Sequence, residues 1–344
     1  MTLTAVVVAP GRGTYNKTEL GYLLRHHAKR RALFDTFDDF RRSQGQETIS
    51  ELDEAPRFIG SKHTRGDNAS PLIYSCAYSD FLAIDRDRID IVAVTGNSMG
   101  WYIALACAGA LNDLGGLQVV NTMGTLMQDH LIGEQLIYPF VNDNWQPVPA
   151  QQQDILATVA RINALPDHVL DLSIDLGGML VLAGNDLGLA AFEREMPRVQ
   201  DRFPMRLPNH AGFHTALQEP VAALGRQALS EDLFRQPSLP LVDGRGGVWW
   251  PHSSHLPALW DYTLNHQVVK SYDFTAAIRT AAREFMPDLF IVLGPGTTLG
   301  GAVAQSLVLS NWRGWDTKNA FQQEQSQNMR LVSMGNPDQR DFVT

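Results

Sequence analysis

A serine between two glycines is the part of the sequence best suited to chemistry. The motif GNSMG (96–100) follows an apolar, β-rich run, Ile89–Thr95, and precedes WYIALACAGAL, whose apolar positions have helical spacing. A strand, a sharp turn and a helix form the context of a nucleophile elbow, in which the turn exposes the serine oxygen. The N–H groups and dipole at the start of such a helix favour a developing oxyanion. The pattern predicts a nucleophilic Ser98, with a serine that only caps a buried helix as the alternative.

A serine needs a base to act as a nucleophile at neutral pH, and the chain has ten histidines that compete for this role. His210 and His214 both lie in PNHAGFHTAL (208–217), a segment that begins as a turn and runs into a helix. Residue type and spacing do not separate the two, because a single histidine more often has a packing or surface role.

The composition excludes several classes of protein. With 344 residues, 44% hydrophobic and 19% charged, the chain is typical of a folded protein longer than one core usually grows. A net charge of −9 argues against nucleic acid as the main partner. The N-terminal apolar run, residues 5–9, is too short for a signal sequence or a membrane span, so we expect a cytoplasmic protein without membrane contact. Cys76 and Cys107 lie in apolar runs, which favours buried thiols and no metal site.

Strands alternate with helices over most of the chain. The expected strands are residues 5–9, 89–95 and 290–294, and helical patterns cover 17–36, 71–84 and 114–130. This alternation predicts a three-layer α/β domain with a mainly parallel sheet, formed by residues 1–129 and 209–344.

The pattern changes between residues 130 and 208, where short strands such as MLVLAG alternate with two helical segments. We expect a small ferredoxin-like α+β subdomain inserted into the larger domain. The tail from Asn311 onward is polar and rich in Gln and Asn, and we expect it to lie over the surface or fray.

Six segments together resemble the malonyl-CoA:acyl-carrier-protein transacylases and the acyltransferase domains of polyketide and fatty-acid synthases. GNSMGWYIALACAG (96–109) is similar to the family's GHSLGEY…CAG, and FHTAL (213–217) is similar to FHSPLM. The other matches are PGRG (10–13) to PGQGSQ, VVNTMGTLMQD (119–129) to LVEMRGKFMQ, VLAGN (181–185) to VIAG, and LGPGTTL (293–299) to VGPGKVL. The matches keep the family's order from residue 10 to residue 299, which makes them jointly specific.

The resemblance implies an acyltransferase with an α/β-hydrolase-like core and no permanently bound cofactor. It places the acylated serine at Ser98 and the base at His214, with backbone N–H groups of Arg12 and Met99 as the oxyanion hole. A backbone carbonyl orients the family's histidine, and we expect it within Tyr262–Asn265. Acyl-CoA is then the donor, an acyl carrier protein is the partner, and the reaction is ping-pong through an ester on the serine.

The chain departs from the family at positions expected to face the substrate. Asn97 stands where the family has His, Arg12 where it has Gln, and Ser70 where it often has Gln. Met123 replaces the arginine that pairs with the malonyl carboxylate, and no Arg or Lys occurs in residues 89–160. We therefore expect a preference for acyl groups without a free carboxylate, unless Arg12 takes over the carboxylate from a different side.

Three other interpretations stay open. An α/β-hydrolase esterase would need a late base such as His252, His255 or His266, but the first third of the chain has no HGG-type oxyanion motif. An acyl-thioester hydrolase on the same fold would let water attack the Ser98 ester. A degenerate family member would only bind a partner, and the intact Ser98 and His214 count against it.

Overall fold

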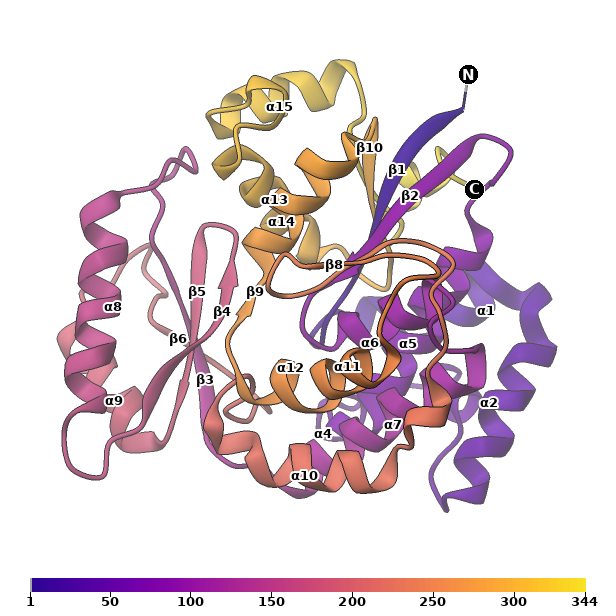
Figure 1. Cartoon of the computed structure of the whole chain (residues 1–344), viewed down its shortest axis with the longest axis horizontal. Helices are drawn as coiled ribbons and strands as arrows, with labels where there is room; N and C mark the ends of the chain where they lie inside the picture. Colours follow the sequence, from indigo (N-terminus) through magenta and orange to yellow (C-terminus); the bar gives the residue numbers. More distant parts are fainter. Residues whose placement is uncertain (1) are drawn as a thin grey trace.

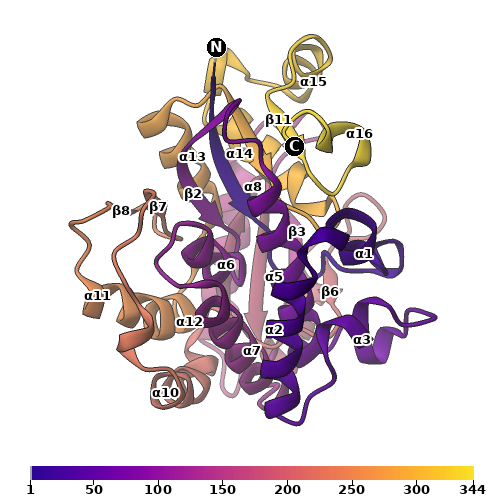
Figure 2. The same cartoon turned by 90° about the vertical axis from the view of Figure 1, so that its right-hand side faces the viewer.

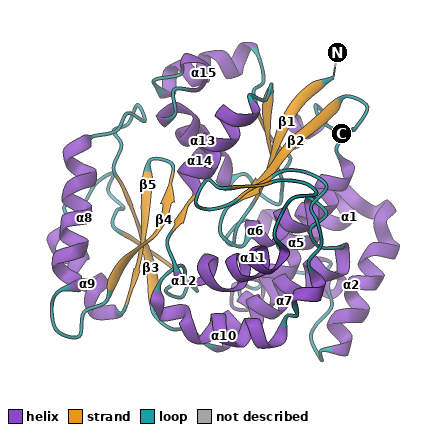
Figure 3. Cartoon of the chain, in the orientation of Figure 1, coloured by secondary structure: helices purple, strands orange, loops and turns teal. Residues whose placement is uncertain are grey.

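The computed structural model describes residues 2–344, which form two β-sheets and the helices around them (Figures 1 and 3). The first sheet has the strand order β11-β10-β1-β2-β7-β8. Its strands are β1 (Leu3–Ala9), β2 (Ile89–Gly96), β7 (Leu241–Val242), β8 (Val248–Trp249), β10 (Leu289–Val292) and β11 (Leu331–Ser333). All neighbours pair in parallel except β7 and β8, which agrees with the predicted mainly parallel sheet.

Helices cover both faces of this sheet, because its central strands are apolar on both sides. Residues 5–9 of β1 are fully buried. Figure 1 shows α13 (Phe274–Phe285) and α14 (Thr298–Leu309) on one side, and α5 (Gly66–Ala83) and α6 (Gly100–Cys107) on the other. Figure 2 gives the same layers from the side. This three-layer α/β arrangement is the predicted fold class.

The remaining helices of this part lie around the layers. They are α1 (Tyr22–His27), α2 (Arg31–Ser43), α3 (Ile49–Asp53), α4 (Gly60–His63), α7 (Asp113–Asp129), α10 (Glu219–Ala228), α11 (Leu256–Asp261), α12 (Gln267–Val269), α15 (Lys318–Gln327) and α16 (Pro337–Arg340). The helical pattern expected over residues 17–36 is present, but it is divided into α1, the start of α2 and 3-10 turns at residues 17–19 and 28–30. Gly21 interrupts it before α1 with a left-handed φ of 80°.

The second sheet has the order β6-β3-β5-β4-β9. Its strands are β3 (Glu134–Pro139), β4 (Leu170–Leu176), β5 (Met179–Gly184), β6 (Met205–Leu207) and β9 (Tyr272–Asp273). Two helices, α8 (Pro149–Asn163) and α9 (Asp186–Glu195), pack on this sheet. The β3–α8–β4–β5–α9–β6 order is the ferredoxin-like arrangement expected for this segment. The exact boundaries at residues 130 and 208 stay a prediction.

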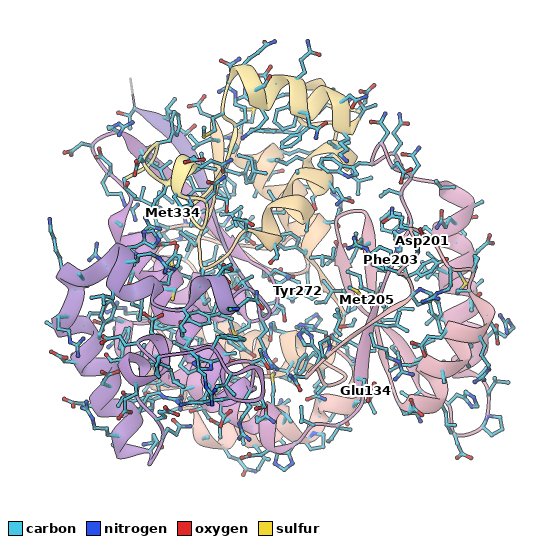
Figure 4. All side chains as sticks on the ribbon, turned by 180° about the vertical axis from the view of Figure 1, so that it is seen from behind. Glu134, Asp201, Phe203, Met205, Tyr272 and Met334 are labelled. Carbon is cyan, nitrogen blue, oxygen red and sulfur yellow. The ribbon has the colours of Figure 1, made fainter. Side chains whose placement is uncertain are left out.

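Strand β9 connects the two parts, because it pairs in parallel with β4 although it lies in the chain just before α13. Tyr272 of β9 lies where the two parts meet (Figure 4), and its hydroxyl donates to the carbonyl of Gly96 at the end of β2. The second sheet is thereby held against the turn that carries Ser98.

The expectation for the polar tail holds for α15, in which Phe321 is the one buried residue, but it is wrong for the residues that follow. Residues 331–333 add β11 to the edge of the first sheet, and Val343 near the C-terminus is fully buried. Arg340 lies in the core, where its Nη2 donates to the buried carboxylate of Asp80 at 2.6 Å. A short apolar run and one buried ion pair are sufficient to anchor a segment whose composition is otherwise that of a surface.

Both thiols are buried, as expected for Cys76 and Cys107. Among residues 2–344, the structure has no helix with the length and apolar character needed to cross a membrane.

Candidate active site

Ser98 lies in the turn between β2 and α6 with a φ of 55°. This left-handed conformation is unusual for a residue with a side chain and projects the hydroxyl away from the helix. The flanking glycines are required by close backbone contacts. A Cβ at Gly96 would lie 2.2 Å from the carbonyl oxygen of Gly100, and one at Gly100 would lie 2.3 Å from that of Ala9. The strand–turn–helix geometry expected from GNSMG is therefore present.

His214 forms a hydrogen bond with Ser98. The distance between Ser98 Oγ and His214 Nε2 is 2.7 Å, and His214 Nδ1 lies 2.6 Å from the backbone oxygen of Gln267. A carbonyl only accepts, so Nδ1 carries the hydrogen and Nε2 is free to accept from the serine. Burial lowers the pKa of His214 to about 4, although the hydrogen bond to the carbonyl acts in the opposite direction. The imidazole is thus neutral and able to take a proton at neutral pH.

The orienting carbonyl was expected within Tyr262–Asn265, and this expectation is wrong by two residues. Tyr262–His266 form a π-helical turn that packs beneath α6, where Thr263 Oγ1 accepts from Trp101 Nε1 at 3.0 Å. The backbone carbonyl that accepts from His214 therefore belongs to Gln267, the residue that follows this wide turn.

Gln267 forms hydrogen bonds to both Ser98 and His214. Its backbone oxygen accepts from His214, its side-chain Nε2 donates to the backbone oxygen of Ser98 at 3.0 Å, and its Oε1 accepts from the Tyr102 hydroxyl at 3.0 Å. Reasoning from the sequence missed this residue. No local signal marks it, because its contacts come from segments more than 50 residues away.

A cavity of about 420 Å³ opens beside Ser98. The structure brings all seven predicted site residues to its wall: Arg12, Ser70, Asn97, Ser98, Met99, Met123 and His214. The cavity is lined by both parts of the chain, since Ile137, Ile174 and Val181 of the second sheet also contribute. A concave, mainly apolar site with a few polar groups beside the nucleophile is typical of a small-molecule site.

The turn after β1 lies directly against the elbow. A Cβ at Gly11 would come within 2.8 Å of the backbone oxygen of Asn97, and the N–H of Asn97 donates to Ala9 at 3.0 Å. Arg12 and Met99 are therefore on neighbouring segments beside Ser98. Their role as the oxyanion hole stays a prediction.

The side chain of Arg12 joins two loops. Its Nη2 donates to the backbone oxygens of Thr64 at 3.0 Å and Asn209 at 3.1 Å, while Nε and Nη1 are buried and have no hydrogen-bond partner among the described residues. Desolvation lowers the pKa of the guanidinium to about 10, so it stays charged. A bidentate fork needs two adjacent nitrogens with free hydrogens, and Nη2 already uses both of its hydrogens. The conformation does not present a carboxylate clamp to the cavity.

Met123 lies on α7 and is fully buried. Its sulfur packs on α10, where a Cβ at Gly225 would come within 2.6 Å of it. Ser70 of α5 lies close to Gly124, since a Cβ at Gly124 would be 2.8 Å from the serine Oγ. The Oδ1 of Asn97 is buried without a hydrogen-bond partner among residues 2–344. The roles of these three residues in binding substrate stay predictions.

The other histidines have different surroundings. His210 also lines the cavity, but its Nδ1 lies 2.8 Å from Oε1 of Gln135, and burial together with the charge of Arg12 lowers its pKa to about 3. His255 caps α11, and His266 stacks on Tyr262. Since the histidine bonded to the serine is His214, the geometry gives no support to an esterase that uses a later histidine.

The fold is an α/β domain with a small second sheet and a serine on a strand–turn–helix elbow, and solved structures share this fold. The solved acyl-carrier-protein S-malonyltransferase of Burkholderia pseudomallei superposes with a TM-score of 0.76 at 21% identity, covering 99% of each chain. The acyltransferase domain from the second module of the salinomycin polyketide synthase superposes with a TM-score of 0.70 at 18% identity, covering 99% of this chain and 71% of that one. The fold is that of these proteins.

Sequence relatives belong to the same group. The human mitochondrial malonyl-CoA-acyl carrier protein transacylase is 24% identical over 234 residues, which are 67% of this chain and 59% of that protein. A phenolphthiocerol/phthiocerol polyketide synthase of Mycobacterium tuberculosis is 22% identical over 241 residues, 69% of this chain but only 15% of that protein. No protein-family model matches the chain. The resemblance to the malonyl-CoA:acyl-carrier-protein transacylases is thereby confirmed.

Proposed function

We propose that the protein moves an acyl group from CoA to the pantetheine thiol of an acyl carrier protein, through an ester on Ser98. The observation that carries the proposal is the Ser98 Oγ–His214 Nε2 contact of 2.7 Å at the edge of the cavity. An uncharged imidazole in hydrogen-bond contact with a serine on a strained turn is the arrangement that activates a serine nucleophile.

In the first half-reaction His214 Nε2 takes the proton of Ser98, and Oγ attacks the thioester carbonyl carbon. The oxyanion that develops is stabilised by the N–H groups of Arg12 and Met99, which bind charge that is present only in the tetrahedral intermediate. Collapse of the intermediate breaks the carbon–sulfur bond, and the leaving CoA sulfur takes the proton from His214.

The second half-reaction reverses these steps with a different thiol. The pantetheine thiol gives its proton to His214, and its sulfur attacks the ester carbonyl carbon. The bond to Ser98 Oγ breaks, and the serine oxygen takes the proton back. The overall exchange needs no oxidant, reductant or permanently bound cofactor.

The acyl group is proposed to lack a free carboxylate. Met123 is fully buried where the family has its carboxylate-binding arginine, and Nη2 of Arg12, which a bidentate fork would need, already donates to Thr64 and Asn209. Without a bidentate cationic partner, a carboxylate in this cavity would recover less of the free energy that its desolvation costs.

The proposed carrier partner is supported by a structural relative. A malonyl-transacylase solved in complex with a type II polyketide synthase acyl-carrier protein superposes with a TM-score of 0.74 at 15% identity. The proposal for this chain follows from the shared fold and the matching site.

Transfer of a radiolabelled acyl group from acyl-CoA to a purified holo acyl carrier protein tests the proposal. His214→Ala should lower the rate by at least ~10²-fold, the lower end of what a positioned general base contributes. His210→Ala is the matched control and should lower the rate far less, because His210 is bonded to Gln135. Equal losses in the two variants would refute the assignment of the base. Release of free acid faster than transfer to the carrier would indicate a hydrolase instead.

A further inference from the structure

One wall of the cavity is a row of branched apolar side chains across the second sheet. Val181 of β5 is paired in register with Ile137 of β3 on one side and with Ile174 of β4 on the other. Directly opposed residues on neighbouring strands face the same side of a sheet, and all three line the cavity. At most 8% of the surface of each of these residues is exposed.

A second wall of the cavity is one face of α7. Val120, Met123 and Met127 are spaced by three and four residues, so they share a helix face, and all three line the same cavity. Phe213 and Val268 add apolar surface next to His214.

The polar groups of the cavity bond mainly to one another and to neighbouring loops. Gln135 accepts from His210 Nδ1 through Oε1 and donates to Ser173 Oγ at 2.7 Å through Nε2. Asn209 donates to Thr64 Oγ1 at 2.9 Å. Among the cavity-lining residues within the described chain, Arg12 is the one Arg, Lys, Asp or Glu; its Nη2 is occupied, and its Nε and Nη1 have no hydrogen-bond partner. Apart from the unpartnered nitrogens of Arg12 and Oδ1 of Asn97, what the cavity offers to an acyl group is mainly apolar surface.

We propose that the cavity selects a hydrophobic acyl chain of medium length, about six to eight carbons. At about 30 Å³ for each water-sized group, its volume holds roughly a dozen non-hydrogen atoms, which accommodates such a chain and its thioester end. This inference rests on the proposed function and adds the substrate class and the residues that set it. An empty cavity between apolar walls lowers stability, so a ligand that fills it gains both desolvation and contacts.

The size of the effect follows from the buried surface. Each methylene group removed from water contributes a factor of about four in an equilibrium or specificity constant. Four added methylenes separate hexanoyl from acetyl, so the specificity constant should rise by roughly 10²-fold between these substrates.

The test measures single-turnover acylation with acetyl-, butyryl-, hexanoyl-, octanoyl- and malonyl-CoA. The specificity constant should rise with chain length up to hexanoyl or octanoyl and be lower for malonyl than for butyryl. Val181→Phe, which adds an aromatic ring to the wall, should lower the hexanoyl constant at least ~10-fold more than the acetyl constant, because it removes room for about four methylenes. Met127→Phe provides a second, milder filling variant. Leu187→Phe, at a half-exposed position on α9 outside the cavity, is the matched control and should change nothing.

Binding to Ser98→Ala separates this inference from the proposed function. Calorimetry should show tighter binding of hexanoyl-CoA than of acetyl-CoA to this unreactive variant. If it does and the wild type still transfers no acyl group, the proposed function fails while the hydrophobic site stands. If acetyl- or malonyl-CoA is preferred, or if Val181→Phe and Met127→Phe leave the order of preference unchanged, the hydrophobic site is refuted.

Discussion

Acylation of the protein should keep nearly its full rate down to about pH 5, because His214 stays neutral far below the pH at which a free imidazole takes up a proton. Burial lowers the pKa of this histidine from 6.5 to about 4. The difference corresponds to about 3 kcal/mol against the imidazolium form. At pH 6 a free imidazole is only about one quarter neutral, whereas a group with this pKa is about 99% neutral.

The assay is single-turnover release of CoA thiol between pH 4 and pH 8, with circular dichroism recorded at each pH. The rate should fall in a single step with its midpoint near the pKa of His214, about 4. In His210→Ala the profile should be unchanged, because that histidine does not contact Ser98. A midpoint near 6.5 in a protein whose circular dichroism is unaltered would refute a buried, neutral base.

The same pKa links protonation to stability. The unfolded chain binds a proton at His214 with a pKa near 6.5 and the folded chain only near 4. Below pH 6.5 protons therefore favour the unfolded state. The contribution of this group to the free energy of unfolding is fully present above pH 6.5 and is lost progressively as the pH falls towards 4.

Two substitutions test other parts of the structure. Arg340→Ala leaves the buried carboxylate of Asp80 without its arginine partner and should lower the free energy of unfolding in urea by ~3–5 kcal/mol. Arg313→Ala is the control: it breaks a partly exposed ion pair with Asp288 at 3.8 Å and should lower the free energy of unfolding by less than ~1 kcal/mol. Equal losses would contradict the assignment of Arg340 to the core. Met123→Arg should shift the specificity constant towards malonyl-CoA by at least ~10-fold, the effect of one buried charged pair, and should lower the melting temperature because the new cation packs on Gly225. An unchanged preference would show that position 123 does not contact the acyl group.

The elbow could be predicted because its signal is local. A β-rich run, two glycines around a serine and a helical pattern occupy about 20 consecutive residues, and each glycine has a steric reason in the structure. His214 could be preferred over His210 as the proposed base only with the help of the family resemblance. His210 and His214 lie four residues apart and both line the cavity, and what separates them is the contact of His210 with Gln135, which no pattern in the segment reveals.

Other features depend on contacts between distant segments. Gln267 forms hydrogen bonds to both Ser98 and His214, and it lies in the short helix after a π-helical turn. The orienting carbonyl therefore comes after the expected residues Tyr262–Asn265. The C-terminal segment looked like surface because its anchoring partner, Asp80, is 260 residues away from Arg340. The apolar wall of the cavity depends on strand register, which sequence alternation suggests but does not fix.

Intact-mass spectrometry of the protein mixed with a panel of acyl-CoAs tests the central claim most directly. We expect that the wild type gains the mass of one acyl group, that a proteolytic map places it on the peptide containing Ser98, and that Ser98→Ala gains none. Normal acylation of Ser98→Ala, or transfer of acyl groups to the carrier protein without any adduct at Ser98 in a rapid quench, would contradict the claim.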